Sequence, residues 1–357
     1  MHLSSKYLIG LVAYFISISM ANAMSAPPLI DPVPDPDQSS VPAFNAQAYA
    51  IHPECDAPRQ AIEFNITGDF SVANNYLLLL ATYLTEQEDG LARQQLSDWG
   101  FSHTEFWKDN LFGIKALISE HEKFTLVSFR GTTSVQDYIN NALFVQHETN
   151  DWIQGQLFEG KMNFGYWNVF VATNKRIYDA VLRNGGGSKP VFFTGHSRGG
   201  NFALINALNF QQKGGNVAGV QSWGQPRIGD TAFNRYVQRE LGDKYHRVER
   251  QLDITPHVPP TVFVADPLQQ SGAIPGLLAE TIKAINYDYS AGRAYVLPNT
   301  GTLYESVDPI ATELGFYNEL FATLGEGYIF ETLPDVIRRT PLNHQPTGYI
   351  CELLRQM

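Results

Sequence analysis

Apolar residues occur along the chain in two kinds of stretch, and the two kinds alternate. Longer stretches carry apolar residues at helical spacing, whereas shorter runs are apolar throughout, which is typical of strands buried on both faces. The expected helices cover 71–86, 170–182, 201–208 and 231–241, another ends near 99, and the expected strands cover 112–119, 123–129, 191–194, 217–223 and 244–251. The first two strands flank a polar turn and are expected to form a hairpin. The alternation predicts an α/β fold with a mostly parallel sheet and helices on both faces.

The strand at 191–194 runs into a Gly-x-Ser-x-Gly turn, and a helical stretch follows directly. This is the context of a nucleophile elbow, a tight turn that exposes a serine hydroxyl at its tip. Gly195 and Gly199 are expected to allow the turn because they lack side chains, and Ser197 is the predicted nucleophile. The alternative is an ordinary glycine-rich turn in which the serine only caps the helix.

A serine nucleophile needs a base and an acid that orients the base, and in the elbow fold they follow the serine in the order acid, then histidine. Of the nine histidines, His257 and His344 follow a plausible acid. We predict Asp253 as the acid because it ends a strand before a proline-rich turn, where sheet enzymes place catalytic side chains. His257 shares that stiff loop, so His344 is the favoured base. The alternatives that stay open are His257 as the base and Asp230 or Asp266 as the acid.

The developing oxyanion needs hydrogen-bond donors, usually the backbone N–H after the nucleophile and one from the end of an earlier strand. Arg198 supplies the first donor through its main chain. Thr132 follows the strand at 123–129 and is the predicted second donor. The alternative is that the segment around Thr132 is a plain strand-ending turn.

Four motifs in a fixed order resemble those of the class 3 (fungal-type) lipases. They are 129–132 (FRGT), 195–200 (GHSRGG), 224–229 (GQPRIG) and 253–259 (DITPHVP), and His344 followed by Tyr349 is similar to the terminal histidine segment of that family. The resemblance implies an α/β-hydrolase fold, ester substrates and no cofactor. It also implies roles for individual residues: Ser197 as nucleophile, Asp253 as acid, His344 as base, and Thr132 and Arg198 as the oxyanion hole.

The chain departs from the family pattern at three places. Arg198 stands where the family usually has Leu, which predicts a more polar wall beside the nucleophile. Asn163 replaces a common His. The segment between Asp253 and His344 is long and contains apparent helices at 275–285 and 309–324, so we expect an insertion at about 265–340.

The resemblance also places a lid at 133–145, directly after the predicted oxyanion strand. Val135, Ile139 and Leu143 would share one apolar face of a helix, and Tyr138 is the fourth lid candidate. Such a helix would cover the site in water and open at a lipid surface. The alternative is an ordinary surface helix.

The N-terminal residues predict a cleavable secretory signal. Lys6 precedes a short apolar run, and an Ala-x-Ala site ends at Ala23, after which we expect cleavage. The run is too short for a membrane anchor, so the mature chain should have none. We therefore expect a signal peptide at 1–23, a flexible arm rich in Pro and Asp at 24–45, and a single α/β-hydrolase domain at 46–357.

Cysteine usage and charge narrow the picture further. Cys55 and Cys351 are the two cysteines, and in a secreted or periplasmic protein they are expected to form a disulfide. The net charge of −11 gives no basic surface for nucleic acid, and no Cys/His cluster has the spacing of a metal site.

Together these patterns predict a secreted serine ester hydrolase without a cofactor or metal. The expected substrates are lipid esters, acylglycerols first, with transient contact at a lipid interface. The alternatives are a phospholipase A-type enzyme, a non-lipid carboxylesterase, an acyltransferase, and a catalytically silent lipid-binding protein.

Overall fold

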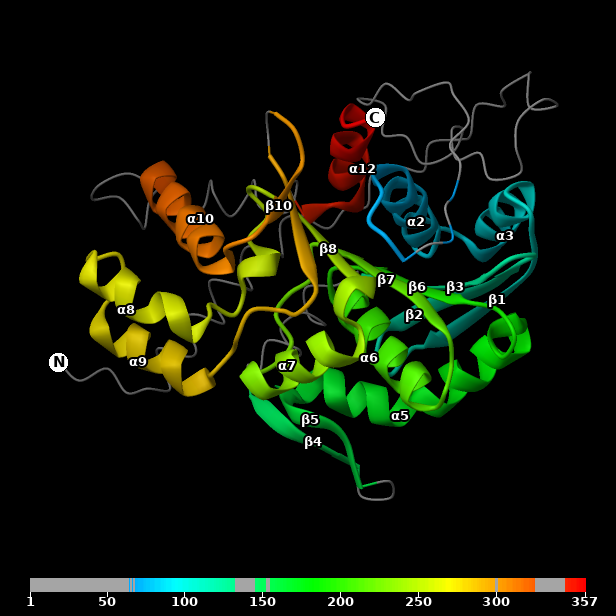
Figure 1. Cartoon of the computed structure of the whole chain (residues 1–357), viewed down its shortest axis with the longest axis horizontal. Coiled ribbons are helices and arrows are strands. Elements are labelled where there is room, and N and C mark those ends of the chain that lie inside the picture. Colours follow the sequence, from blue (N-terminus) through cyan, green and yellow to red (C-terminus); the bar gives the residue numbers. More distant parts are fainter. Residues whose placement is uncertain are drawn as a thin grey trace.

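The structure is a computed structural model of the chain, and it describes residues 64, 66, 68–131, 145–151, 155–298, 301–324 and 344–357. Within these residues one sheet has eight strands in the order β1-β2-β3-β6-β7-β8-β9-β10 (Figure 1). Neighbouring strands are parallel from β3 through β6, β7 and β8 to β9, whereas β1, β2 and β10 pair antiparallel. The predicted mostly parallel sheet is therefore confirmed.

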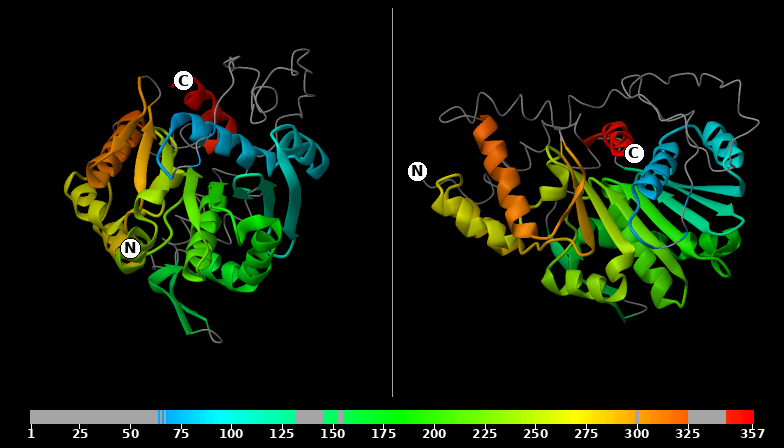
Figure 2. Two further views of the ribbon diagram at one scale, coloured as in Figure 1. Left: turned by 45° about the vertical axis from the view of Figure 1, so that its right-hand side comes forward. Right: turned by 45° about the horizontal axis from the view of Figure 1, so that its top comes forward.

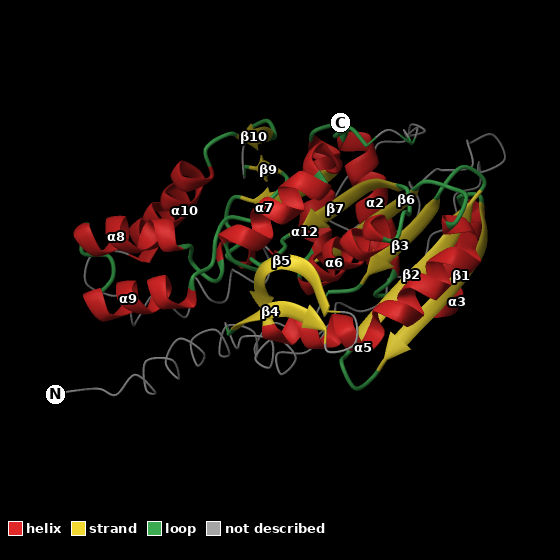
Figure 3. Cartoon of the chain, turned by 60° about the horizontal axis from the view of Figure 1, so that its bottom comes forward, coloured by secondary structure: helices red, strands yellow, loops and turns green. Residues whose placement is uncertain are grey.

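The strands of this sheet are β1 (Phe101–Asp109), β2 (Ile114–His121), β3 (Thr125–Phe129), β6 (Val191–His196), β7 (Val217–Trp223), β8 (Tyr245–Arg250), β9 (Arg293–Leu297) and β10 (Tyr304–Ser306). A separate hairpin consists of β4 (Gln146–Asp151) and β5 (Gly155–Asn163), and it lies beside α5 in Figure 3. The helices are α2 (Val72–Leu84), α3 (Asp89–Asp98), α5 (Phe164–Val181), α6 (Arg198–Gln212), α7 (Thr231–Glu240), α8 (Val262–Gln270), α9 (Gly276–Ile285), α10 (Pro309–Leu324) and α12 (Pro346–Arg355). Short helical turns cover Leu182–Gly186, Gly242–Lys244 and Thr255–His257.

Helices cover both faces of the sheet, as Figures 1 and 2 show. On one face α5, α6 and α7 pack over a cluster that includes Val191 and Phe193 of β6. On the other face α2, α3 and α12 pack over a cluster that includes Phe192. Successive side chains of a strand point to opposite faces, so a strand covered on both faces is apolar throughout. This explains why β3, β6 and β7 were predictable from their apolar runs.

The segment after β8 adds a third group of helices at one end of the sheet. Helices α8, α9 and α10 share their own apolar cluster, which includes Val264, Leu268 and Phe316. Between α9 and α10 the chain returns to the sheet as β9, which pairs in parallel with β8. The expected insertion therefore contains two of the helices predicted from sequence and also extends the central sheet.

Several sequence predictions fall outside the described residues. They are the signal peptide at 1–23, the arm at 24–45, Cys55, Thr132, and the lid candidates Val135, Tyr138, Ile139 and Leu143. Among the helices that the structure describes, none combines the length and the apolar character needed to cross a bilayer.

Candidate active site

The turn between β6 and α6 holds Ser197 in an unusual backbone conformation. Its φ is 56° and its ψ is −131°, a region that residues other than glycine rarely adopt. The Ser197 N–H donates a 2.8 Å hydrogen bond to the carbonyl oxygen of Trp223 at the end of β7. Strain of this kind persists only where the surroundings impose it, and it is frequent at active sites.

The glycines around Ser197 are required by close backbone contacts. A Cβ atom on Gly195 would lie 2.2 Å from the carbonyl carbon of Gly199. A Cβ atom on Gly199 would lie 2.3 Å from the carbonyl oxygen of Phe129 at the end of β3. The turn therefore packs directly on the neighbouring strand, and no side chain fits at either position.

We expect Gly199→Ala to destabilise the protein by about 1–3 kcal/mol, because the new methyl group must displace backbone atoms of β3. Gly90→Ala is a matched control, since Gly90 is also the second residue of a helix and a Cβ atom there meets nothing within 4 Å. Urea unfolding of the two variants measures the difference. Equal stabilities would show that the contact with β3 is not tight.

Asp253 and His344 lie together at the carboxyl ends of the parallel strands, although they are far apart in sequence. The Nδ1 atom of His344 is 2.8 Å from Oδ2 of Asp253. The Tyr349 hydroxyl donates to the same carboxylate oxygen at 2.6 Å, and the Thr255 N–H donates to Oδ1 at 2.9 Å. Asp253 is fully buried. Burial alone would raise its pKa, but the His344 charge and these hydrogen bonds hold the pKa below its usual value.

Tyr349 links helix α12 to the acid. Its hydroxyl donates to Asp253 and accepts a 3.1 Å hydrogen bond from the backbone N–H of Arg250. Burial raises the pKa of Tyr349 well above its ordinary value, so the hydroxyl stays a donor. Because His344 lies two residues before the start of α12, this helix sets the position of both partners of Asp253.

His196, the last residue of β6, packs against His344 beneath the turn. Its ring centroid lies 4.6 Å from that of His344, and its Nε2 is 2.5 Å from the His344 carbonyl oxygen. Burial, followed by the nearby His344, lowers the pKa of His196 to about 3. The ring is therefore neutral and donates Nε2–H to the carbonyl, which helps to hold the backbone of His344. No pattern in the sequence indicated this contact.

Gly224 lies against the acid and the histidine. Its φ is +58°, and a Cβ atom there would lie 2.8 Å from Oδ2 of Asp253 and 2.9 Å from Nδ1 of His344. The third sequence motif thus leaves space for the Asp253–His344 pair, a role that appears only when the strand ends are brought together.

The alternative acid and base residues occupy other places. His257 is buried, and its ring stacks on Phe316 at 4.0 Å with an interplanar angle of 13°. Asp230 caps α7 by accepting a 2.9 Å hydrogen bond from the N–H of Phe233. Asp266 forms a 2.5 Å ion pair with Lys283 on the outside of the helical insertion. The structure therefore brings Asp253 to His344 and leaves the alternatives in structural contacts.

The side chain of Arg198 is buried and contacts the β1–β2 turn. Its side chain is 3% exposed, its Nη2 donates a 2.6 Å hydrogen bond to the carbonyl oxygen of Gly113, and its guanidinium lies over the Phe202 ring. The guanidinium group points to the β1–β2 turn, where the Gly113 carbonyl oxygen accepts its hydrogen bond. The Arg198 side chain thus joins the β1–β2 turn to α6, and the more polar wall beside the nucleophile stays a prediction.

Of the two predicted oxyanion donors, Arg198 belongs to the described residues and Thr132 does not. Arg198 is the first residue of α6, so its N–H lies at the helix N-terminus directly after Ser197. Gly131, which precedes Thr132, lies close enough that a Cβ atom on it would be 3.4 Å from Cβ of Ser197. The end of β3 is thus beside the nucleophile, and the role of Thr132 stays a prediction.

Glu86 is a titratable group near the site that the sequence did not indicate. It follows α2, and burial raises its pKa to about 7, although the charges of Arg130, His344 and Lys115 act in the opposite direction. A carboxyl group with such a pKa is half protonated near neutral pH.

The raised pKa of Glu86 predicts a pH-dependent stability. The folded state retains a proton on Glu86 that the unfolded chain releases from about pH 4.5. The stabilisation that comes from this bound proton is therefore complete below that pH and is lost as the pH rises through about 7. Relative to wild type, Glu86→Gln should therefore gain on the order of 1–2 kcal/mol between about pH 5 and pH 8. Glu88→Gln, at an exposed neighbour, is the control. Parallel pH curves of unfolding free energy for Glu86→Gln and wild type would contradict the prediction.

Comparison with known proteins places this site in a family context. A family model described as class 3 lipase matches residues 126–263. A lipase of Rhizomucor miehei is 30% identical over 165 residues, which are 44% of this chain and 44% of that protein. A Fusarium solani protein named secreted mono- and diacylglycerol lipase 1 is 30% identical over 143 residues, 40% of this chain and 41% of that protein. The matched part spans less than half the length of each relative.

A solved structure is similar over a longer part of the chain. It is a deletion mutant of a Rhizomucor miehei lipase propeptide complex, with 21% identity and a TM-score of 0.50, and the match covers 83% of this chain and 87% of that one. At this identity the likeness concerns the fold alone. Together with the parallel sheet and its flanking helices, it identifies the α/β-hydrolase fold.

Proposed function

We propose that the chain belongs to the class 3 lipase family, whose model matches residues 126–263, and that it is a secreted serine ester hydrolase of lipid esters. The observation that carries the proposal is the Asp253–His344 hydrogen bond of 2.8 Å at the same edge of the sheet as the strained Ser197 turn. Acylglycerols are the leading substrates, because relatives carry the names lipase and secreted mono- and diacylglycerol lipase.

The proposed chemistry is acyl transfer in two steps. The Ser197 hydroxyl attacks the ester carbonyl carbon while His344 accepts its proton, and the resulting oxyanion accepts hydrogen bonds from the N–H groups of Arg198 and Thr132. The intermediate collapses, and His344 returns the proton to the departing alcohol. Water then attacks the acyl-enzyme by the same route and releases the fatty acid. Asp253 holds the imidazole and stabilises its protonated form.

Secretion and lipid contact belong to the same proposal. The relatives named as secreted and the predicted signal with cleavage after Ala23 support an extracellular or periplasmic enzyme. A lid at 133–145 would open at the surface of its substrate. We also propose a disulfide between Cys55 and Cys351, which would tie the early chain to α12. In support, the described part of the chain contains no free cysteine.

A fluorophosphonate probe and a substrate panel test the proposed function. The probe should label wild type on Ser197 and leave Ser197→Ala unlabelled, whereas a silent lipid-binding protein would not be labelled at all. Triacylglycerol, monoacylglycerol, phospholipid and aryl esters then separate a lipase from a phospholipase or an esterase. Competition between an added alcohol and water separates hydrolysis from acyl transfer to alcohols. Highest activity on phospholipid would replace the acylglycerol assignment.

A further inference from the structure

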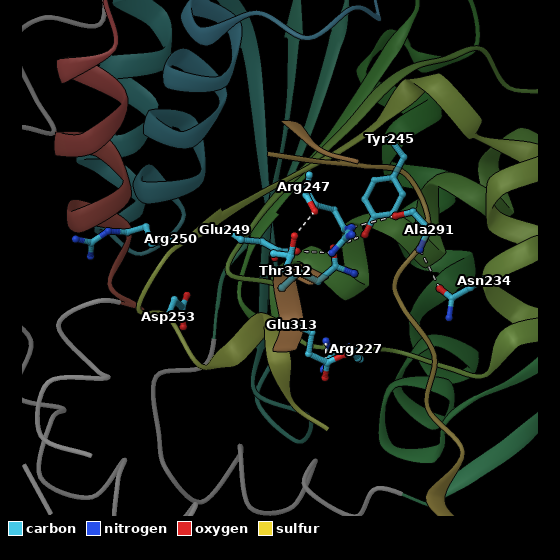
Figure 4. A network of polar contacts seen from close by, with 12 residues as sticks. Arg227, Asn234, Tyr245, Arg247, Glu249, Arg250, Asp253, Ala291, Thr312 and Glu313 are labelled. Carbon is cyan, nitrogen blue, oxygen red and sulfur yellow. Dashed lines mark hydrogen bonds and ion pairs between the residues drawn. The ribbon is translucent and has the colours of Figure 1, made fainter. Parts of the chain in front are cut away.

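Helix α10 of the insertion lies against the loop that follows β8 and carries Asp253. Figure 4 shows Glu313 of α10 next to Arg227, with Asp253 on the neighbouring part of the loop. The loop has little regular structure beyond the short turn Thr255–His257. Its position therefore depends on side chains that reach it from other elements.

Glu313 is the centre of the first set of contacts. Its side chain is 1% exposed and forms a 3.1 Å ion pair with Arg227. It accepts hydrogen bonds from the Thr261 N–H at 3.1 Å and the Thr261 hydroxyl at 2.7 Å. Arg227 donates to the carbonyl oxygen of Pro259 at 2.7 Å, and its N–H donates to the carbonyl of Val258 at 3.0 Å. One buried carboxylate thus fixes the far end of the loop directly and through Arg227.

Two further side chains of α10 contact the loop closer to the acid. The Tyr317 hydroxyl donates a 2.8 Å hydrogen bond to the carbonyl oxygen of His257, whose ring stacks on Phe316. Glu319 accepts a 3.0 Å hydrogen bond from Nε2 of Gln251. Gln251 precedes Asp253 in the chain and His257 follows it. Helix α10 therefore holds the chain on both sides of the acid.

We propose that α10 is part of the active site, and that Glu313, Tyr317 and Glu319 are positioning residues for Asp253. This inference rests on the proposed function. The carboxylate of Asp253 must stay within hydrogen-bond distance of His344, and a displacement of about 1 Å can cost about a hundredfold in rate. None of the three side chains needs to touch the substrate to have this effect.

The test compares variants that remove one contact of α10 at a time. Tyr317→Phe removes a hydroxyl and keeps the ring, and Glu319→Leu removes the oxygen atoms that accept the hydrogen bond from Gln251. Each is expected to lower kcat by about tenfold on a soluble ester, with KM unchanged within about twofold. The downfield proton resonance of the Asp253–His344 hydrogen bond should broaden or shift in the same variants. Glu313→Gln is a third variant. If it does not fold, the other two variants decide whether α10 positions Asp253.

Matched controls come from the same insertion. Tyr304→Phe alters a tyrosine that is 50% exposed on β10, and Glu280→Leu alters an exposed acid on α9 that pairs with Lys283. Both controls should retain wild-type kcat. Thermal unfolding of every variant shows that activity is measured on folded protein.

The outcomes separate this inference from the function on which it rests. Wild-type kcat and an unchanged downfield resonance in folded Tyr317→Phe and Glu319→Leu would overturn the positioning role, even if their melting temperatures fell. Equal losses in the two control variants would overturn it as well. A wild-type protein that neither hydrolyses esters nor reacts with a fluorophosphonate would overturn the proposed function and this inference together.

Discussion

Alanine at Ser197, Asp253 or His344 is expected to lower kcat for ester hydrolysis by about three orders of magnitude or more, with the fold retained. Loss of the serine removes the nucleophile, and loss of the histidine removes the proton acceptor. Loss of the acid leaves an imidazole without its 2.8 Å partner. Because the three groups act as a unit, combining the substitutions should add little to the largest single loss.

Three exposed residues of the same types provide the controls. Ser188, Asp266 and His147 are exposed, and alanine at each should leave kcat near wild type. Steady-state kinetics on an aryl ester and circular dichroism of each variant complete the measurement. Near-wild-type turnover by His344→Ala would contradict the assignment of the base and return attention to His257.

The sequence predicted those parts of the fold that are buried on both faces. The strands β6 and β7 were found within a few residues because a short apolar run between glycine-rich turns is typical of a fully covered strand. The strands β1, β9 and β10 were not predicted. β1 is an edge strand with a partly exposed, polar sequence, and β10 spans only Tyr304–Ser306, so neither carries a clear pattern.

Prediction of the site had a similar limit. The chain order of the motifs was enough to propose Asp253 and His344 as partners, although they are distant in sequence. It did not reveal the contact of His196 with the His344 carbonyl or the raised pKa of Glu86. The His196 contact and the pKa of Glu86 depend on which ends of strands and helices lie together in the fold, and a local sequence pattern does not indicate this. The direction of the Arg198 side chain was missed for the same reason, since its acceptor is the β1–β2 turn.

The segment between Asp253 and His344 is integrated into the fold, because it packs on the loop of the acid and adds strands to the sheet. Helices α9 and α10 were predicted from the sequence, whereas α8 and the relation of these helices to the site were not. The buried ion pair between Glu313 and Arg227 joins the insertion to a residue of the third motif. Removing one partner of such a pair leaves an uncompensated buried charge, which typically costs about 3–5 kcal/mol. The family motif and the insertion are therefore expected to depend on each other for stability.

Gly224→Ala is expected to lower kcat by about a hundredfold while the protein stays folded. The new Cβ atom would lie 2.8 Å from Oδ2 of Asp253 and 2.9 Å from Nδ1 of His344, so the hydrogen-bonded pair must move apart or shift away from Ser197. The substitution also forces alanine into a left-handed conformation, which costs about 1–2 kcal/mol of stability.

Gly214→Ala separates these two effects. Gly214 has a φ of +82°, and a Cβ atom there meets nothing within 4 Å, so this variant carries the backbone cost without the contact. Gly224→Ala should lose at least as much stability as Gly214→Ala in urea unfolding, and only Gly224→Ala should lose activity and fluorophosphonate reactivity. If both kept wild-type kcat, the Asp253–His344 pair would tolerate displacement, and its geometry would not limit the rate.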